Sequence, residues 1–130
     1  RVHERVASRY VCGRVILAGD AAHLNNPLGG MGMNGGIHDA VNLTDKLAAV
    51  WRGADPALLG RYERQRRKIA IDTVQAQALR NRSLMNERDP AKRQAFYDDL
   101  RATADDPVRH REYVMRSSMI KSLQDVEAVQ

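Results

Sequence analysis

The residues best suited to chemistry lie in one glycine-rich segment, residues 13–36. Seven of the nine glycines fall within it, and Asp20 follows a short aliphatic run at residues 15–18. The run predicts a buried strand that delivers the Asp20 carboxylate to its C-terminal end, the edge at which α/β sheets bind ligands. Glycine lets a loop approach another group without a Cβ in the way. The segment therefore predicts a cofactor-binding loop.

This segment runs into a helix, and the junction suits a negatively charged ligand. From Asn34 to about Trp51, apolar residues recur at three- and four-residue steps, and Gly53 is a typical C-cap. The predicted apolar face holds Ile37, Val41, Thr44, Leu47, Ala48 and Trp51, and the polar face holds Asp39, Asn42, Asp45, Lys46 and Arg52. The free amides of a helix N-terminus attract negative charge. An acidic acceptor and a ring of N–H donors fit a ligand with hydroxyl groups and a developing anion.

The order of these residues resembles the second FAD-binding motif of flavoprotein aromatic hydroxylases, the monooxygenases of the para-hydroxybenzoate hydroxylase type. That motif is Gly-Asp-Ala-Ala-His, a proline, and a glycine-rich turn ending in Gly-x-Asn before a helix. Here its parts stand at residues 19–23, Pro27, residues 29–30 and residues 32–34. The later Tyr-Glu-Arg-x-Arg-Arg at residues 62–67 also resembles the family, so the similarity extends over about residues 13–67.

The resemblance implies eight cofactor-binding residues, which are Gly19, Asp20, Pro27, Gly29, Gly30, Gly32, Met33 and Asn34. Asp20 would accept hydrogen bonds from the ribityl hydroxyls of FAD, and Pro27 would lie beside the isoalloxazine ring. The two glycines at residues 29–30 would let the loop pass close to the ring. The amides of residues 32–34 would face flavin N1 and the C2 carbonyl and stabilise the charge of the reduced flavin. We expect His23 to pack and hydrogen-bond under the loop, and we assign no catalytic side chain and no metal ligand.

The implied activity is that of an NAD(P)H-dependent monooxygenase. NADH or NADPH would reduce FAD, and a flavin hydroperoxide would place one atom of O2 on a small aromatic, phenolic substrate. The sequence lacks the strand–GxGxxG–helix unit that binds the ADP half of FAD. We therefore expect a C-terminal fragment of an α/β FAD/NAD(P)-binding fold, inactive alone. Its single cysteine, Cys12, cannot form an internal disulfide, which predicts a cytoplasmic protein.

Three other functions stay open from the residues alone. Flavin reductases and halogenases share this motif but not the reaction. A non-catalytic helical interaction module could retain the flavin loop, and a homodimer formed by swapping an exposed strand would favour that interpretation. A nucleic-acid binder would fit the net charge of +5, but acidic and basic residues are interspersed without interleaved aromatics, so we expect no nucleic-acid binding.

The rest of the chain is predicted to be helical scaffold. Residues 1–53 would hold a strand, the FAD-contacting loop and the helix that follows, with a second strand at about residues 2–7, and residues 54–130 would form a helical segment. Three Asp-Pro pairs predict helices over about residues 56–86, 90–104 and from 107, because Asp favours the N-cap and Pro the first helical position. A last helix is expected at about residues 119–127. The fold class is mostly α with one or two short β-strands, and no segment approaches the roughly 20 apolar residues of a membrane span.

Overall fold

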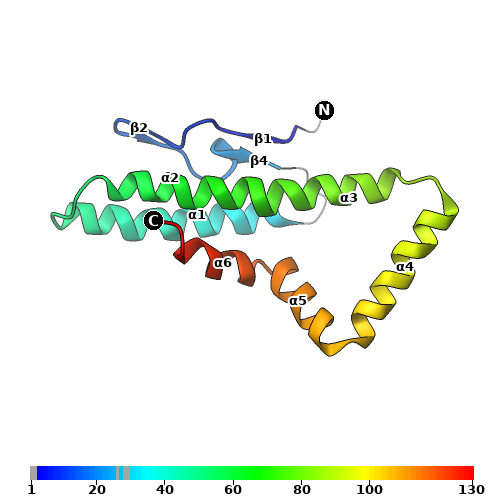
Figure 1. The fold of residues 1–130 in the computed structure, drawn as a ribbon. Helices are drawn as coiled ribbons and strands as arrows, with labels where there is room; N and C mark the ends of the chain where they lie inside the picture. The colour runs from blue at the N-terminus through cyan, green and yellow to red at the C-terminus, as the bar shows by residue number, and fades with distance from the viewer. Residues whose placement is uncertain (1–2, 26, 28–29) are drawn as a thin grey trace.

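The computed structural model describes residues 3–25, 27 and 30–130. Its body is a pair of antiparallel helical runs, formed by α1 (Met31–Trp51) and by the continuous run of α2 (Leu58–Ile69), the π-helical turn η2 (Ala70–Gln75) and α3 (Ala76–Asn86). Short strands lie along one side of this pair and α6 (Ile120–Glu127) lies along the other, while α4 (Pro90–Asp105) and α5 (Pro107–Ser117) form a V-shaped arm (Figure 1). The prediction of a mostly helical fold is confirmed.

The strands form two small antiparallel ladders. β1 (Arg5–Val6) pairs with β4 (His23–Leu24), and β2 (Val11–Cys12) pairs with β3 (Val15–Ile16) across a turn at Gly13, whose φ is +57°. The prediction of a buried strand over residues 15–18 is wrong, because β3 ends at Ile16 and Val15 is 64% exposed. Within the described part of the chain, β3 has β2 as its one strand neighbour, so it is an edge strand and not the central strand of a sheet.

Helix α1 begins three residues before the predicted start. Gly30 is its N-cap, in the left-handed region at φ +66°, so Gly32, Gly35 and Gly36 belong to the helix and not to an irregular loop. The C-terminus follows the prediction: the helix ends at Trp51, and Gly53 takes a φ of +100°.

The two faces of α1 are oriented opposite to the prediction. Asp39, assigned to the polar face, is fully buried, whereas Trp51 and Ile37, assigned to the apolar face, are 91% and 52% exposed. Side chains on the buried side of the helix form hydrogen bonds and ion pairs with the strand layer and with α2. These polar contacts, and not the apolar periodicity, determine which side of the helix is buried.

The helices after α1 begin close to their predicted positions. The carboxylate of Asp55 accepts the amide of Ala57 at 2.8 Å, which places the start of α2 two residues after Pro56. Asp89 and Asp106 cap α4 (Pro90–Asp105) and α5 (Pro107–Ser117) by accepting amides at 2.9 Å and 2.8 Å. The break before α6 falls at Met119, which has a φ of +63°.

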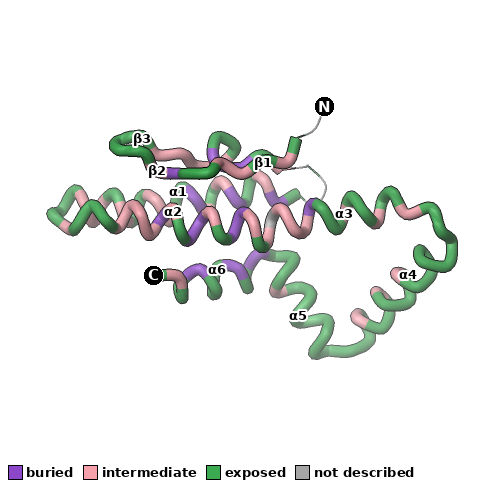
Figure 2. The backbone as a smooth tube through the Cα atoms, turned by 45° about the horizontal axis from the view of Figure 1, so that its top comes forward, coloured by how far each residue is buried: buried purple, intermediate pink, exposed green. Residues whose placement is uncertain are grey.

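The buried core is small and lies between the strands and the helical pair. Tyr10, Ala22 and Tyr62 form its centre, and half-buried residues such as Leu17 and Leu43 pack against it. The Tyr62 hydroxyl donates to the Leu17 carbonyl at 2.7 Å, which ties α2 to the strand layer. Buried positions gather along α1, α2, the strands and α6 in Figure 2, whereas α4 and α5 have none among their described residues. No helix in the described ranges is long and apolar enough to cross a bilayer.

Candidate functional site

The predicted flavin-contacting residues gather at the junction between a 3₁₀ turn and the start of α1. The turn η1 (Gly19–Ala21) follows β3 and carries Asp20, whose side chain is exposed. At the start of α1, Gly30 is the N-cap and donates its amide to the Pro27 carbonyl at 3.1 Å. Gly32, Met33 and Asn34 follow in the first turn of the helix. Gly29 lies outside the described residues.

A backbone-to-backbone contact between two glycines holds η1 against α1. A Cβ built on Gly36 would lie 3.4 Å from the Cα of Gly19, and one built on Gly35 would lie 3.2 Å from Cε1 of His23. Gly19 also has a φ of +59°, a conformation that favours glycine. These three glycines therefore let η1 and His23 approach α1, and Asp20, which follows Gly19 in η1, is exposed at this junction.

The first turn of α1 presents amides to an uncharged surface. A helix that starts at Met31 has no intrahelical carbonyl for the amides of Gly32 and Met33, whereas the amide of Asn34 faces the carbonyl of Gly30. Met33 is 74% exposed, and the side chain of Asn34 is exposed as well. The turn reads Met-Gly-Met-Asn and holds no acidic side chain of its own, and its amides form the positive end of the helix dipole. This geometry suits an electron-rich acceptor.

Asp39 lies at the centre of the contacts that fix this junction, a role that the sequence analysis missed. Its Oδ2 accepts the Gly19 amide at 2.9 Å and His23 Nε2 at 2.7 Å, and its Oδ1 accepts Arg66 Nε at 2.6 Å. Arg66 also donates to the Gly35 carbonyl at 3.3 Å. We call these contacts the Asp39 network. They join η1, β4, α1 and α2 at one carboxylate.

The Asp39 network is buried, and its charges are paired. Burial by itself would raise the pKa of Asp39, but the hydrogen bonds from His23 and Arg66, the charge of Arg66 and the Gly19 amide outweigh burial and lower that pKa. Nδ1 of His23 lies 3.0 Å from Nδ2 of Asn25, an amide donor, so we assign the ring proton to Nε2, which donates to Asp39. His23 is 2% exposed, which confirms the expectation that it packs under the loop.

The Tyr-Glu-Arg-x-Arg-Arg motif on α2 anchors the N-terminal elements. Glu63 Oε2 accepts the amides of Tyr10 and Val11, both at 2.7 Å, and Arg67 Nε donates to the Ala7 carbonyl at 3.0 Å. The burial of Arg66 could have been predicted from the sequence. Arg66 stands four residues after Tyr62 and three before Ile69, which places it on the buried face of α2. An arginine on such a face requires a buried acid as its partner.

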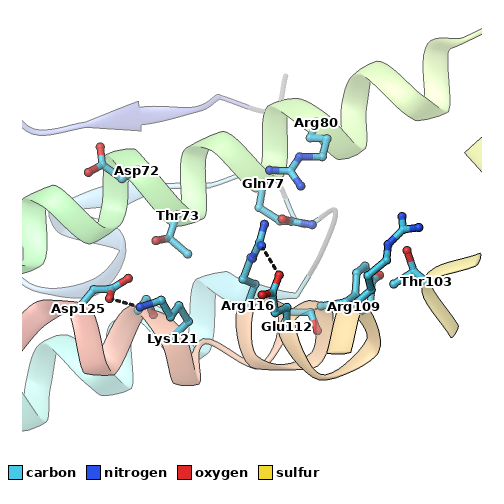
Figure 3. A pocket seen from close by; sticks show the side chains of 13 residues that line it. Asp72, Thr73, Gln77, Arg80, Thr103, Arg109, Glu112, Arg116, Lys121 and Asp125 are labelled. Atoms are coloured by element: carbon cyan, nitrogen blue, oxygen red, sulfur yellow. Dashed lines mark hydrogen bonds and ion pairs between the residues drawn. The ribbon is translucent and has the colours of Figure 1, made fainter. Parts of the chain in front are cut away.

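A separate cleft of about 560 Å³ lies between the η2–α3 run and the α5–α6 segment, and Figure 3 shows its lining. Its lining includes none of the seven predicted flavin residues that the structure describes. Much of its charge is neutralised internally, because Arg116 pairs with Glu112 at 3.2 Å and Lys121 pairs with Asp125 at 2.6 Å. Among the described residues, no group of three or more His, Cys, Asp or Glu side chains could hold a metal ion. The η1–α1 junction is therefore the candidate site.

Comparison with known proteins gives the family of this chain. A family model described as an FAD binding domain matches residues 1–77. The para-nitrophenol 4-monooxygenase of Pseudomonas sp. (strain WBC-3) is 46% identical over 94 residues, which is 72% of this chain and 23% of that enzyme. The crystal structure of p-nitrophenol 4-monooxygenase PnpA from Pseudomonas putida DLL-E4 superposes with a TM-score of 0.84 at 38% identity, covering 94% of this chain and 30% of that one.

A second solved structure, described as the Diels-Alderase PyrE3 of pyrroindomycin biosynthesis, has a TM-score of 0.75 at 36% identity and covers 89% of this chain and 25% of that one. The chain thus spans about a quarter of the length of the proteins that it matches. These comparisons confirm the resemblance that the glycine-rich motif indicated, with FAD as the cofactor of the family. By the match over residues 1–77, the chain belongs to the FAD-binding domain family.

Proposed function

We propose that this chain supplies the flavin-facing half of the FAD site in an NAD(P)H-dependent monooxygenase that hydroxylates aromatic compounds. The η1–α1 junction carries this proposal, because the turn η1 carries an exposed carboxylate and packs against α1, a helix whose first amides are free. The residues fit a flavin: the turn is uncharged, Met33 and Asn34 are exposed, and no described group lies within 4 Å of a Cβ built on Gly30 or Gly32. A flat ring therefore has room to approach the backbone here.

Each residue at the junction has a distinct task in this proposal. Asp20 accepts hydrogen bonds from ribityl hydroxyls, as a carboxylate on an exposed turn is able to do. The amides of Gly32 and Met33 donate to the electron-rich edge of the ring system and stabilise negative charge there. Asn34 contributes its exposed side chain, because its own amide faces the Gly30 carbonyl. FAD, when bound, supplies the electron-transfer and oxygen chemistry.

The division of the chain follows from the same arrangement. The proposed contacts to the cofactor all come from residues 1–53, and residues 54–130 form the helical segment that holds them in place. Arg66 and Glu63 belong to the second part and reach back to the first. Gly29 and Pro27 keep their predicted places beside the ring in this proposal.

The substrate, reductant and assembly are proposed from the relatives and the composition. The relative from Pseudomonas sp. is named for para-nitrophenol, so we propose a small phenolic substrate, with O2 and NADH or NADPH as co-substrates. The complete reaction needs polypeptide beyond these 130 residues, since the Pseudomonas sp. relative is about three times as long. We keep the cytoplasm as the predicted location, given the free and exposed Cys12, and a homodimer as a predicted assembly.

A second candidate function uses the same site for a different reaction. The similarity to PyrE3, described as a Diels-Alderase, favours this alternative, because it shows that proteins of this fold carry other activities. In that case the junction would still hold the flavin, but NAD(P)H oxidation would not depend on an aromatic substrate.

A chimera tests the proposal. This chain replaces the matching region of the para-nitrophenol 4-monooxygenase from Pseudomonas sp., and the purified chimera is assayed for bound flavin and for NADPH oxidation with and without para-nitrophenol. We expect bound FAD and oxidation stimulated by the phenol. Asp20→Ala should lose FAD on gel filtration, whereas Asp45→Ala, an exposed acid on α1 away from the junction, should retain it. A folded chimera without flavin would contradict the proposal, and flavin without phenol-stimulated oxidation would favour the second candidate.

A further inference from the structure

The turn between α5 and α6 has a backbone conformation that its residue type does not favour. Met119 is buried, with 1% of its surface exposed, and its φ of +63° lies in the left-handed region. It follows Ser118, the C-cap of α5, at the position where glycine is the ordinary residue. Of the residues that the structure describes, Met119 is the one non-glycine with a positive φ. Because a Cβ is unfavourable in this conformation, a side chain here requires a compensating contact.

The compensating contact is with Met31, the first residue of α1. Met31 and Met119 form a small buried cluster of their own, in which Met31 is 8% exposed. Met31 directly precedes Gly32 and Met33, whose amides are free. Methionine side chains adapt their shape to fill a gap between packed elements. The Met119 side chain therefore supports the helix turn that carries the proposed flavin donors.

We propose that Met119 is a positioning residue for the flavin site, whose side chain holds Met31 and thereby directs the amides of Gly32 and Met33 toward the flavin. The inference rests on the proposed function. It gives the C-terminal helices a role at the cofactor, although Met119 lies outside residues 1–77, the part of the chain that the family model matches.

Hydrogen bonds on α6 keep Met119 in place. The Met119 carbonyl accepts the Ser122 hydroxyl at 2.7 Å, and Ser122 is itself buried in the first turn of α6. The other end of α6 is fixed to α2, because Gln65 Nε2 donates to the carbonyls of Val126 and Val129, both at 3.0 Å. Met119 thus stands on an element that α2 holds at its far end, which makes it a firm support for α1.

The proposed flavin site is then held from two sides. The Asp39 network fixes η1, which carries Asp20, against α1. Met119 contacts the start of α1 from the segment that includes α6, which lies on the other side of the helical pair from the strands (Figure 1). Loss of the Met119 side chain should therefore displace the amides of Gly32 and Met33 and leave Asp20 in place.

The test separates the Met119 side chain from the backbone conformation at this position. Met119→Ala removes the contact and keeps a Cβ in the left-handed conformation, whereas Met119→Gly removes the contact and relieves that conformation. Met119→Leu keeps an apolar side chain of similar volume. The matched control is Met85→Ala, at a methionine of α3 that is 69% exposed.

Flavin binding should follow the side chain and not the stability. Each ¹⁵N-labelled 130-residue chain is titrated with FMN and its melting temperature is measured. Met119→Gly should melt at a higher temperature than Met119→Ala, but both should bind FMN about fivefold to tenfold more weakly than the unsubstituted chain, as expected for the loss of one hydrogen bond. Met119→Leu and Met85→Ala should bind FMN as the unsubstituted chain does. Binding that follows the melting temperature across the four variants would assign Met119 a role in stability alone and overturn the proposal.

The reduction potential of the flavin in the chimera with the Pseudomonas sp. enzyme is a second readout. The amides of Gly32 and Met33 stabilise negative charge on the reduced flavin, so their displacement should make the potential more negative in Met119→Ala and Met119→Gly. Met119→Leu should restore the potential of the unsubstituted chimera. An unchanged potential in the Ala and Gly variants would overturn the proposal.

Amide signals of the flavin-free chain distinguish a failure of this inference from a failure of the proposed function. Met119→Ala and Met119→Gly should shift the signals of Gly32 and Met33 and leave that of Asp20 unchanged. Such shifts in a chain that does not bind FMN would support the positioning of the turn by Met119 and contradict the flavin site. Equal FMN binding by all four variants, without these shifts, would support the flavin site and overturn the role of Met119.

Discussion

Asp39 and Arg66 form an ion pair of 2.6 Å between α1 and α2, and both side chains are excluded from solvent, with 0% and 2% exposed. The same carboxylate accepts the amide of Gly19, the residue before Asp20. The pair thus links the long helical run to the turn that carries the proposed ribityl acceptor. Its removal should affect both stability and the position of that turn.

Substitution of Arg66 should destabilise the chain more than substitution of any exposed basic residue. Arg66→Met leaves the Asp39 carboxylate buried with its main counter-charge gone, and we expect a loss of about 3–5 kcal/mol in the free energy of unfolding. Urea unfolding followed by circular dichroism measures it. The matched control is Lys68→Met, which breaks the exposed pair with Asp72 and should cost less than about 1 kcal/mol. Equal losses in the two variants would contradict the role of the pair.

Stability should decline in acid through the titration of Asp39. Its pKa is lower in the folded chain than in the unfolded chain, where it is about 3.9. The stabilisation is therefore present above pH 4 and is lost as the pH falls through the folded value. In Asp39→Asn, the free energy of unfolding should fall less steeply with decreasing pH, as urea titrations at a series of pH values would measure. An unchanged dependence on pH in the variant would assign the acid sensitivity to other carboxylates.

The glycines of α1 should respond differently to alanine. Gly35→Ala places a Cβ 3.2 Å from the His23 ring, and we expect a destabilisation of about 1–2 kcal/mol. Gly32→Ala meets no described atom within 4 Å and should leave stability unchanged or raise it by up to about 1 kcal/mol. Thermal melts of the two variants check this order. A reversed order would show that the contact between His23 and α1 is not tight.

The single tryptophan reports directly on the exposed face of α1. Trp51 is 91% exposed, so its fluorescence in the isolated chain should be quenched by acrylamide nearly as strongly as that of a free tryptophan derivative. Weak quenching at low protein concentration would mean that the side chain is covered in solution. Dilution should leave the quenching unchanged if the chain is a monomer.

Local chemistry made much of this molecule predictable. The Asp-Pro pairs mark helix starts because a cap is formed by residues adjacent in sequence, and Asp89 and Asp106 cap their helices as expected. The described residues of the glycine-rich motif also lie together at one junction, where η1 meets the start of α1. His23 is buried against α1, where it lies next to Gly35 and hydrogen-bonds to Asp39.

Contacts between residues far apart in the sequence explain why the predictions for α1 and β3 were wrong. The orientation of α1 depends on Arg66, which stands 27 residues after Asp39, and no periodicity within α1 reveals that partner. The apolar residues that predicted a buried face, such as Ile37 and Trp51, are exposed instead. β3 was expected to be buried, but burial of a strand depends on neighbours from elsewhere in a sheet.

The most direct test of the flavin site is a titration of the ¹⁵N-labelled chain with FMN, which carries the flavin and ribityl parts of FAD without the ADP half. We predict saturable shifts at the amides of Gly19, Asp20, Gly32 and Met33, with little change at Ser117 and Lys121 in the charged cleft. Shifts confined to that cleft, or no saturable shift at the η1–α1 junction, would contradict the assignment of the junction as the flavin-facing half of an FAD site.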